Sequence, residues 1–372
     1  MINPKEFLRL FIKEKIRFYT GVPDSTLKGF ITELMSSKKI SHRIAVNEGN
    51  AIGSAIGYHL ATSKVPLVYM QNSGLPHAIN PILTLSKLYS IPMIIIIGWR
   101  GYVGVGPKGK RKDEPQHINI GPSTKSLLAS CKLTTIVLNR KHYKKQIKMA
   151  VKKAKRKSKT VVILMKRRII DQYEPRIART KFNFKRYDFL ELLIKNRKRN
   201  DNFVATTGFS ARELYYLNEK FKIGHARSFY SVGAMGHAAI IASELTNFQK
   251  KSKKNRTYII DGDGAALMHL GSMTITGKMK NKNLVHIIFN NRIHESTGNH
   301  PVSNENFNFK KMFKICGYKN SYEINDLKRF KSILKKTSLK GPVGLVINIK
   351  PGTISNLPRQ DSPKILKKAL NF

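Results

Sequence analysis

Short β-branched and apolar runs alternate along this chain with stretches of helical period, and they do so in two separate parts. The alternation covers Val65 to Gly98 and again Thr257 to Asn290. Such alternation is typical of βαβ units, in which helices join the strands of a parallel sheet. Eight strands are predicted: Val65–Tyr69, Met93–Ile97, Thr135–Leu138, Val161–Met165, Phe203–Thr206, Thr257–Asp261, Leu284–Asn290 and Val343–Ile349. The pattern therefore predicts an α/β fold with two parallel sheets.

Residues 173–187 separate the two alternating parts. This segment has neither the helical nor the strand period, and it contains Pro175, as linkers often do. We predict one domain over residues 1–172 and another over residues 188–372. A chain of 372 residues also exceeds the size at which a single hydrophobic core keeps growing, so its length favours two domains.

The composition is that of a globular protein, with 41% hydrophobic residues. The longest apolar run, Ile91 to Gly98, is far shorter than the roughly 20 residues of a membrane-spanning helix, so we expect a buried strand and no membrane. Charged residues interrupt every apolar stretch near the N-terminus, unlike a secretory signal. Cys131 and Cys316 are too few for a disulfide framework. We expect two buried thiols in a cytoplasmic protein.

The formal net charge of +47 raises the question of a nucleic-acid partner. Its densest part, Arg140 to Arg168, holds 14 Lys or Arg and no Asp or Glu. Within that part the residues Ile147, Ala150, Val151 and Ala154 recur at helical spacing. The lysines are therefore expected to coat the solvated face of an amphipathic helix, and a polyanion-binding surface is the less favoured alternative. A positive field would in either case attract an anionic substrate.

Glycines and acidic residues follow a predicted strand of the second domain. The strand leads into Asp261-Gly262-Asp263-Gly264, and a helical pattern runs from Leu267 to Met279. Carboxyl ends of parallel strands are where ligands bind in open α/β sheets. Gly262 and Gly264 allow the backbone to approach a diphosphate, whose charge faces the amides that open the next helix.

A pair of asparagines, Asn290 and Asn291, follows the next strand, and Asn291 lies 28 positions after Asp263. Because the two strands are expected to be neighbours, Asp263 and Asn291 would offer hard oxygen ligands at one edge of the sheet. Mg²⁺ prefers such oxygens together with those of phosphate groups. The alternative is an ordinary strand, turn and helix in which the aspartate is a cap.

The spacing of Gly262-Asp263-Gly264 and Asn290-Asn291 resembles the signature of thiamine-diphosphate enzymes. This resemblance implies thiamine diphosphate and Mg²⁺ as cofactors. It implies that Asp263 and Asn291 bind the metal through their side chains and that Ile293 does so through its backbone carbonyl. It further implies a pyrimidine-side domain over 1–172 and a diphosphate-side domain over 188–372, without a middle domain.

Glu48 stands in the first domain before a helix rich in small residues, Ile52 to Ala61. Pressed against glycine and alanine, its carboxyl group has little access to water. The resemblance implies that this group hydrogen-bonds the aminopyrimidine ring of the cofactor and promotes loss of a proton from the reactive carbon. A glutamate that merely opens a helix is the alternative.

Two turns of the second domain extend the resemblance. Met235, between Gly233 and Gly236, matches the bulky apolar residue that supports the bent conformation of the cofactor, with a plain core methionine as the alternative. Thr206, Thr207 and Gly208 end a predicted strand and resemble the turn on the pyrimidine side of the cofactor.

Several phrases resemble phosphonopyruvate decarboxylases in particular, over essentially the full length, and sulfopyruvate decarboxylases share much of this pattern. The phrases are Thr20–Ser25, Gln71–Gly74, Ile97–Gly101, Asp113–His117 and His294–Gly298. The stretch Tyr102 to Lys112 departs from the family pattern because it is longer and more basic.

A three-carbon acid with a carboxylate and a phosphonate needs cationic and hydrogen-bonding partners, because burying an unpaired charge is costly. Arg100 is the first candidate, with a surface salt bridge as its alternative. The loop residues Gln71, Asn72 and Ser73 are candidates to line the pocket.

Asp24 and His117 are the candidates for proton transfer to the product. The alternatives are a turn-forming aspartate and a surface histidine.

The implied reaction is the decarboxylation of 3-phosphonopyruvate, a small anionic 2-oxo acid, to phosphonoacetaldehyde and CO₂. The alternatives are sulfopyruvate decarboxylation, carboligation or 2-oxo acid oxidation with the same cofactor, and a non-enzymatic polyanion-binding protein. Enzymes of the resembled family assemble their cofactor site between subunits. We therefore expect a homodimer or higher homo-oligomer, with Glu48 of one subunit facing Asp263 and Asn291 of another.

Overall fold

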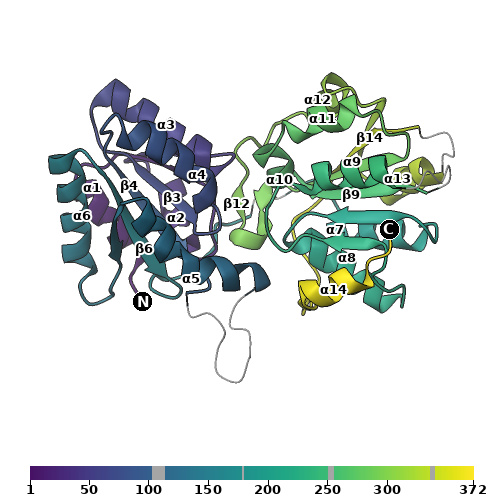
Figure 1. The fold of residues 1–372 in the computed structure, drawn as a ribbon, viewed down its shortest axis with the longest axis horizontal. Coiled ribbons are helices and arrows are strands. Elements are labelled where there is room, and N and C mark those ends of the chain that lie inside the picture. Colours follow the sequence, from purple (N-terminus) through teal and green to yellow (C-terminus); the bar gives the residue numbers. More distant parts are fainter. Residues whose placement is uncertain (103–113, 178–179, 250–254, 336–339) are drawn as a thin grey trace. The chain divides into compact units, whose positions relative to one another are not determined.

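Each half of the chain builds a six-stranded sheet in which every pairing is parallel. The structure is a computed structural model that describes residues 1–102, 114–177, 180–249, 255–335 and 340–372 (Figure 1). It divides into a first unit, Met1–Arg176 with Ser296–Ser303, and a second unit, Ile177–Glu295 with Asn304–Phe372. The chain passes between the units inside the segment 173–187. Nothing in the sequence pattern had indicated that Ser296–Ser303 belongs with the first unit.

The first sheet has the strand order β2-β1-β3-β4-β6-β5. Its strands are β1 (Phe18–Gly21), β2 (Ser41–Ile44), β3 (Leu67–Gln71), β4 (Met93–Trp99), β5 (Thr134–Val137) and β6 (Thr160–Lys166). The helices of this unit are α1 (Pro4–Lys13), α2 (Lys28–Ser36), α3 (Glu48–Thr62), α4 (Leu75–Pro81), the π-helical η1 (Ile82–Lys87), α5 (Pro115–Ser130) and α6 (Tyr143–Lys157).

The second sheet has the strand order β13-β14-β10-β9-β7-β8. Its strands are β7 (Asn202–Ala205), β8 (Ser228–Tyr230), β9 (Thr257–Gly262), β10 (Leu284–Asn290), β13 (Asn320–Ile324) and β14 (Val343–Asn348). Its helices are α7 (Arg186–Lys195), α8 (Phe209–Lys220), α9 (Ala238–Phe248), α10 (Asp263–Met268), α11 (Ser272–Lys278), α12 (Phe309–Ile315), α13 (Leu327–Lys335) and α14 (Pro363–Ala369). The short elements β11 (Ile293–His294), η3 (Glu295–Thr297) and β12 (His300–Pro301) follow β10.

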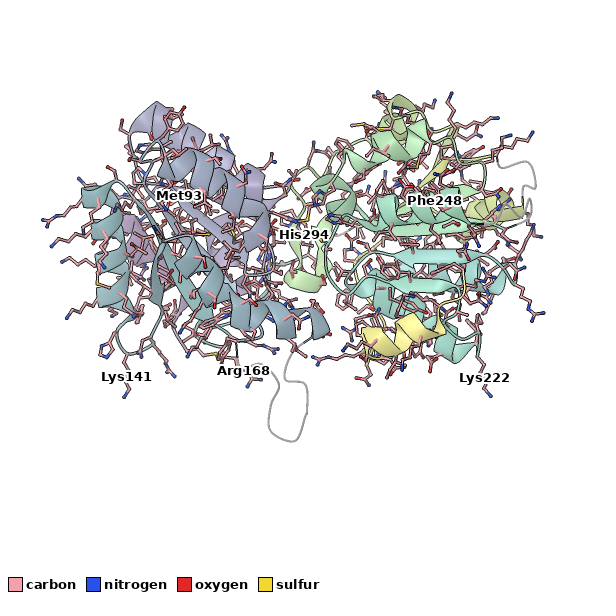
Figure 2. All side chains as sticks on the ribbon, in the orientation of Figure 1. Met93, Lys141, Arg168, Lys222, Phe248 and His294 are labelled. Atoms are coloured by element: carbon pink, nitrogen blue, oxygen red, sulfur yellow. The ribbon has the colours of Figure 1, made fainter. Side chains whose placement is uncertain are left out.

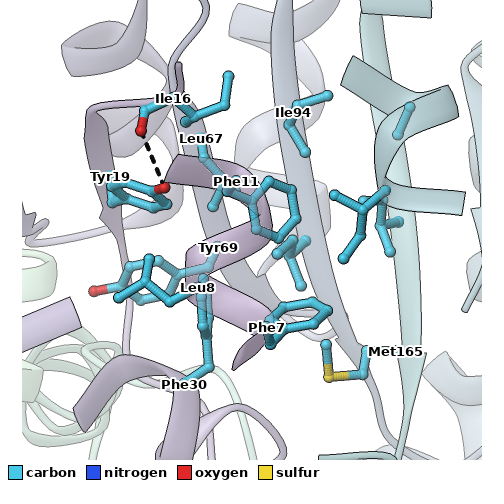
Figure 3. Packing of buried hydrophobic residues seen from close by; sticks show 14 of the residues in the cluster. Phe7, Leu8, Phe11, Ile16, Tyr19, Phe30, Leu67, Tyr69, Ile94 and Met165 are labelled. Carbon is cyan, nitrogen blue, oxygen red and sulfur yellow. Dashed lines mark hydrogen bonds between the residues drawn. The ribbon is translucent and has the colours of Figure 1, made fainter. Parts of the chain in front are cut away.

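Both faces of the first sheet are covered, which explains why β4 is apolar at nearly every position. Ile94 and Ile96 pack with α1, α2 and α6, a core that Figure 3 shows around Phe7 and Phe11. Ile95, at the intervening position, packs with α3 and α4 on the opposite face. Each fully buried side chain of this size contributes roughly 1.5–3 kcal/mol of transfer free energy. A strand buried on both faces therefore reads as a continuous hydrophobic run.

All eight predicted strands are present, with ends within two residues of the expected ones. Four strands of the two six-stranded sheets were not predicted: β1, β2, β8 and β13. They are three to five residues long, and β2 (Ser-His-Arg-Ile) lies at a sheet edge with exposed polar positions. The prediction of a single helix from Leu267 to Met279 was wrong. Two short helices occupy this stretch, because His269 leaves the helical conformation and Gly271, a poor helix former, precedes α11.

The lysine-rich segment forms α6 as expected, with Ile147, Ala150, Val151 and Ala154 buried and most of its lysines exposed. The side chains of Lys141 and Lys222 likewise point outward (Figure 2). Both cysteines are free and buried. None of the helices in the described ranges combines the length and the apolar character that crossing a membrane requires.

Candidate functional site

Four neighbouring strands of the first unit present candidate side chains at their carboxyl ends. Glu48 follows β2, Asp24 follows β1, Gln71 ends β3 and Arg100 follows β4. These strands are consecutive in the order β2-β1-β3-β4. The topology thus gathers residues that are far apart in sequence at the edge where open α/β sheets bind ligands.

Glu48 is the first residue of α3, and its side chain is buried. A Cβ atom built on Gly74 would lie 1.8 Å from its Oε1 atom, so the carboxylate lies directly against the glycine backbone. The Nδ1 atom of His77, on α4, is 3.3 Å from Oε2. The hydrogen bond with Glu48 raises the pKa of His77. Glu48 therefore does open a helix, yet its carboxylate is directed toward α4 and not toward water.

Asp24 is fully buried and is held by its neighbours on β3 and β4. Its Oδ1 atom accepts a hydrogen bond of 2.7 Å from Nε2 of Gln71, whose Oε1 atom accepts one of 2.6 Å from Oγ of Ser73. Its Oδ2 atom lies against Gly98, where an added Cβ would come within 1.8 Å. Burial raises the pKa of Asp24, and the Gln71 hydrogen bond and the Arg100 charge oppose this shift. Such a carboxyl group retains its proton more readily than an exposed one, as a proton donor requires.

Asn72 ties the ends of β3 and β4 to α5. Its Nδ2 atom donates to the carbonyl of Arg100 (3.0 Å) and to Oγ1 of Thr124 (2.9 Å), and its Oδ1 atom accepts from the backbone N–H of Arg100 (3.1 Å). Both hydrogens of its side-chain amide thus take part in hydrogen bonds within the protein. Asn72 positions Arg100, whose Nη1 atom donates to Oγ of Ser25, 2.8 Å away and next to Asp24.

His117 lies in the first turn of α5 and is 4% exposed, so the surface-histidine alternative is wrong. Close backbone packing holds α5 at the end of β4. Nε1 of Trp99 donates to the carbonyl of Gly121 (2.7 Å). Gly101, with φ +67°, leaves no room for a Cβ beside the carbonyl of His117. Residues 103–113, which include most of the basic departure from the family pattern, lie outside the described residues.

In the second unit, Asp263 connects the ends of β9 and β10. It opens α10 and is 3% exposed. Its Oδ1 atom accepts from the N–H of Gly264 (2.7 Å), and its Oδ2 atom accepts from the N–H of Arg292 (2.5 Å) in the turn after β10. Burial raises the pKa of Asp263 to about 7. The predicted adjacency of the two strands is correct.

The two asparagines after β10 have different roles. Asn290 is buried and donates to Oδ1 of Asn348 on β14 (2.9 Å), inside the sheet. Asn291 lies beyond the strand, where its Oδ1 atom accepts from the N–H of Ile293 (3.1 Å) and its Nδ2 atom donates to Oε2 of Glu295 (3.2 Å). Only the second asparagine therefore places its side chain in the turn beside Asp263.

The same edge of the second sheet has features that fit a bound diphosphate. A Cβ atom at Gly262 would meet nothing within 4 Å, so its backbone faces open space. The hydroxyls of Thr206 and Ser231, at the ends of β7 and β8, are buried and have no hydrogen-bond partner among the described residues. Buried polar groups normally have partners, and these two would find them in phosphate oxygens. Sequence reasoning had placed Thr206 in the turn that resembles the pyrimidine side of the cofactor, but it missed Ser231, although each of the two directly follows a strand.

The remaining cofactor candidates lie in turns of this unit. Gly208 has φ +97°, a conformation that favours glycine, and Thr207 beside it is half-buried. Met235 is half-buried between Ala234 and Gly236, both of which have positive φ. Such partial exposure differs from that of a fully packed core methionine.

Comparison with known proteins agrees with this geometry. Residues 5–120 match the family described as thiamine pyrophosphate enzyme, N-terminal TPP binding domain, and residues 208–349 match the corresponding C-terminal TPP binding domain. The chain therefore belongs to the thiamine pyrophosphate enzymes. This confirms the predicted pair of parallel-sheet domains and the expected cofactor, thiamine diphosphate.

Its curated relatives are named decarboxylases. The chain is 28% identical to a phosphonopyruvate decarboxylase of Streptomyces viridochromogenes, over 93% of this chain and 87% of the relative. It is also 28% identical to that of Streptomyces hygroscopicus, over 98% and 91% of the two chains. A sulfopyruvate decarboxylase of Methanosarcina acetivorans is 22% identical over 100% and 98%.

Proposed function

We propose that this protein decarboxylates 3-phosphonopyruvate to phosphonoacetaldehyde and CO₂, with thiamine diphosphate and Mg²⁺ as cofactors. The observation that carries the proposal is the gathering of buried Glu48, buried Asp24 and cationic Arg100 at the edge of one sheet. Similarity to phosphonopyruvate decarboxylases over 93% and 98% of the chain supports the choice of substrate.

The second unit would hold the diphosphate end of the cofactor and the metal. Asp263 and Asn291 would bind Mg²⁺ through side-chain oxygens and Ile293 through its carbonyl, which is the hard oxygen set that this ion prefers. The backbone at Gly262 and Gly264 would face the diphosphate. Met235 would support the bent cofactor, with Gly233 leaving room beside it and Thr207 and Gly208 near the pyrimidine ring.

The bound cofactor would supply the carbon that attacks the keto group and the positively charged ring that takes up the electron pair left behind when CO₂ departs. Glu48 would exchange a proton with the pyrimidine ring, because its carboxylate lies against Gly74 and away from water. Arg100, Gln71 and Ser73 would bind the phosphonate. Asp24, whose burial favours the protonated form, would donate a proton to the carbon that CO₂ leaves, and His117 is the alternative donor.

Sulfopyruvate is the second candidate substrate, because a sulfopyruvate decarboxylase is similar over the whole chain. The kcat/KM values for phosphonopyruvate, sulfopyruvate and pyruvate decide between the candidates. The proposal expects phosphonopyruvate to give the highest value. A higher value for sulfopyruvate would reassign the substrate, and a salt-sensitive affinity for DNA without cofactor-dependent turnover would favour a polyanion-binding protein.

We also propose a homodimer or higher homo-oligomer in which Glu48 of one subunit serves the same cofactor as Asp263 and Asn291 of another. The two motifs lie in different units of the chain. A two-fold pairing of identical chains would create two equivalent sites.

A further inference from the structure

A buried ion network runs through the second unit next to the proposed metal ligands. Arg186, the first residue of α7, donates from Nε and Nη2 to the two oxygens of Glu213 at 2.9 and 3.2 Å. Its Nη1 atom donates to Oε2 of Glu295 at 3.0 Å. The side chains of Arg186, Glu213 and Glu295 are 6%, 0% and 9% exposed. An arginine that bridges two carboxylates in this way holds both in fixed orientations.

Glu295 in turn fixes the orientation of the Asn291 side chain. Besides Arg186, its Oε2 atom accepts the Nδ2 hydrogen bond of Asn291 (3.2 Å), and its Oε1 atom accepts from the N–H of Gly352. A carboxylate accepts hydrogen bonds and cannot donate them. Glu295 therefore selects the nitrogen end of the Asn291 amide and leaves the oxygen end to face elsewhere. An asparagine with its amide turned round would present N–H groups, which cannot bind a cation.

The network also holds two carboxylates for one guanidinium, since both Glu213 and Glu295 accept hydrogen bonds from Arg186. A buried carboxylate is stabilised by an opposite charge nearby. Glu295, which contacts Asn291, would therefore favour a divalent cation at that asparagine.

We propose that Glu295 is a positioning residue for the metal. It orients Asn291 for Mg²⁺ and adds negative charge to the site, while Arg186 and Glu213 hold Glu295 in place. The proposal rests on the metal site of the proposed function. Outer partners of metal ligands generally act in this way, and their loss weakens metal binding by about 10–100-fold.

The test is Mn²⁺ binding in the presence of thiamine diphosphate, measured from the electron paramagnetic resonance signal of free Mn²⁺, which needs no turnover. The Glu295→Gln variant keeps the size of the side chain but loses its negative charge, and its N–H₂ group must face either the N–H of Gly352 or the donors of Asn291 and Arg186. Its Mn²⁺ affinity is expected to fall by about 10–100-fold. The matched control is Glu191→Gln, also on the second unit, where a partly exposed carboxylate pairs with Lys220 at 2.9 Å. This control is expected to bind Mn²⁺ like the wild type.

The same substitution in an Asn291→Ala background shows whether Glu295 acts through Asn291. The expected result is that most of the Glu295→Gln loss disappears there, because the oriented ligand is already gone. If Glu295→Gln binds Mn²⁺ as tightly as the wild type and its circular dichroism is unchanged, the proposal is overturned. An equal loss of Mn²⁺ affinity in the wild-type and Asn291→Ala backgrounds would also overturn it. A wild-type protein that binds no Mn²⁺ with the cofactor would overturn the metal site as well. Normal Mn²⁺ binding without turnover of phosphonopyruvate would contradict only the proposed reaction.

Discussion

The carboxylate of Glu48 occupies the space that a side chain at Gly74 would need, since a Cβ atom there would lie 1.8 Å from Oε1. Glu48 opens α3, and Gly74 is the residue before α4. Residue 74 must therefore be glycine, because any side chain there would displace the proposed catalytic carboxylate.

Replacing Gly74 with alanine is expected to displace Glu48 and to lower kcat by about 100-fold, the lower range for loss of a general acid or base. The control is Gly53→Ala in α3, where an added Cβ meets nothing within 4 Å. That change should leave kcat unaltered and stabilise the protein by about 0.5–1 kcal/mol, because alanine is the better helix former. Steady-state kinetics and thermal unfolding give both values. Full activity in Gly74→Ala would mean that Glu48 need not stay where the structure places it.

Glu48→Gln separates cofactor binding from proton exchange. The amide has the size of the carboxylate but is a poor partner for exchanging a proton with the pyrimidine ring. Calorimetry should show thiamine diphosphate bound about as tightly as by the wild type, while turnover falls by at least about 100-fold. Near-normal turnover would remove Glu48 from the proposed chemistry.

Asp24→Asn should make the protein more stable and less active. The pKa of Asp24 is raised by burial, so the folded state holds a proton that the unfolded state loses above about pH 4. Its contribution to stability is present below that pH and is lost as the pH rises toward the folded-state pKa. Asparagine cannot ionise, and its Oδ1 atom can still accept from Gln71. The melting temperature of Asp24→Asn relative to the wild type should therefore increase from pH 4 to pH 8. An equal difference at both pH values would show that burial of the charge is not costly here.

Sites shared between subunits are tested by mixing Glu48→Ala chains with Asp263→Ala chains. Each variant alone should be inactive. In a mixed dimer one site carries both defects and the other carries neither, so equal random mixing should restore about a quarter of the wild-type activity. If subunit exchange is verified by mass spectrometry and no activity returns, each site is confined to one chain.

The features that were predicted best from the sequence are those that depend on the local pattern of apolar and polar residues. Fully buried strands such as β4 form uninterrupted apolar runs that the pattern reveals directly. Asp263 and Asn291 follow adjacent strands, so the spacing between them reflects one βαβ unit. Short or polar strands such as β2 lack a distinct period, because only part of each is buried. Their positions follow from pairing with β1, which local sequence does not record.

Contacts between residues that are far apart in the chain could not be predicted from the sequence. Glu295 was noticed only as part of a family phrase, and its link to Arg186 spans 109 positions. Gly74 likewise gave no sign that it faces Glu48, which is 26 positions earlier and on a different element. Such relationships arise from tertiary packing, so a structure is needed to find them.

The central claim is that this protein decarboxylates phosphonopyruvate with thiamine diphosphate and a divalent metal, and phosphorus NMR tests it most directly. The wild-type protein is incubated with phosphonopyruvate, thiamine diphosphate and Mg²⁺, beside samples that lack the cofactor or contain EDTA. The phosphonopyruvate signal should be replaced by that of phosphonoacetaldehyde only in the complete mixture, with an equal amount of CO₂ released. An unchanged phosphonopyruvate signal, from protein that binds the cofactor and metal, would contradict the account.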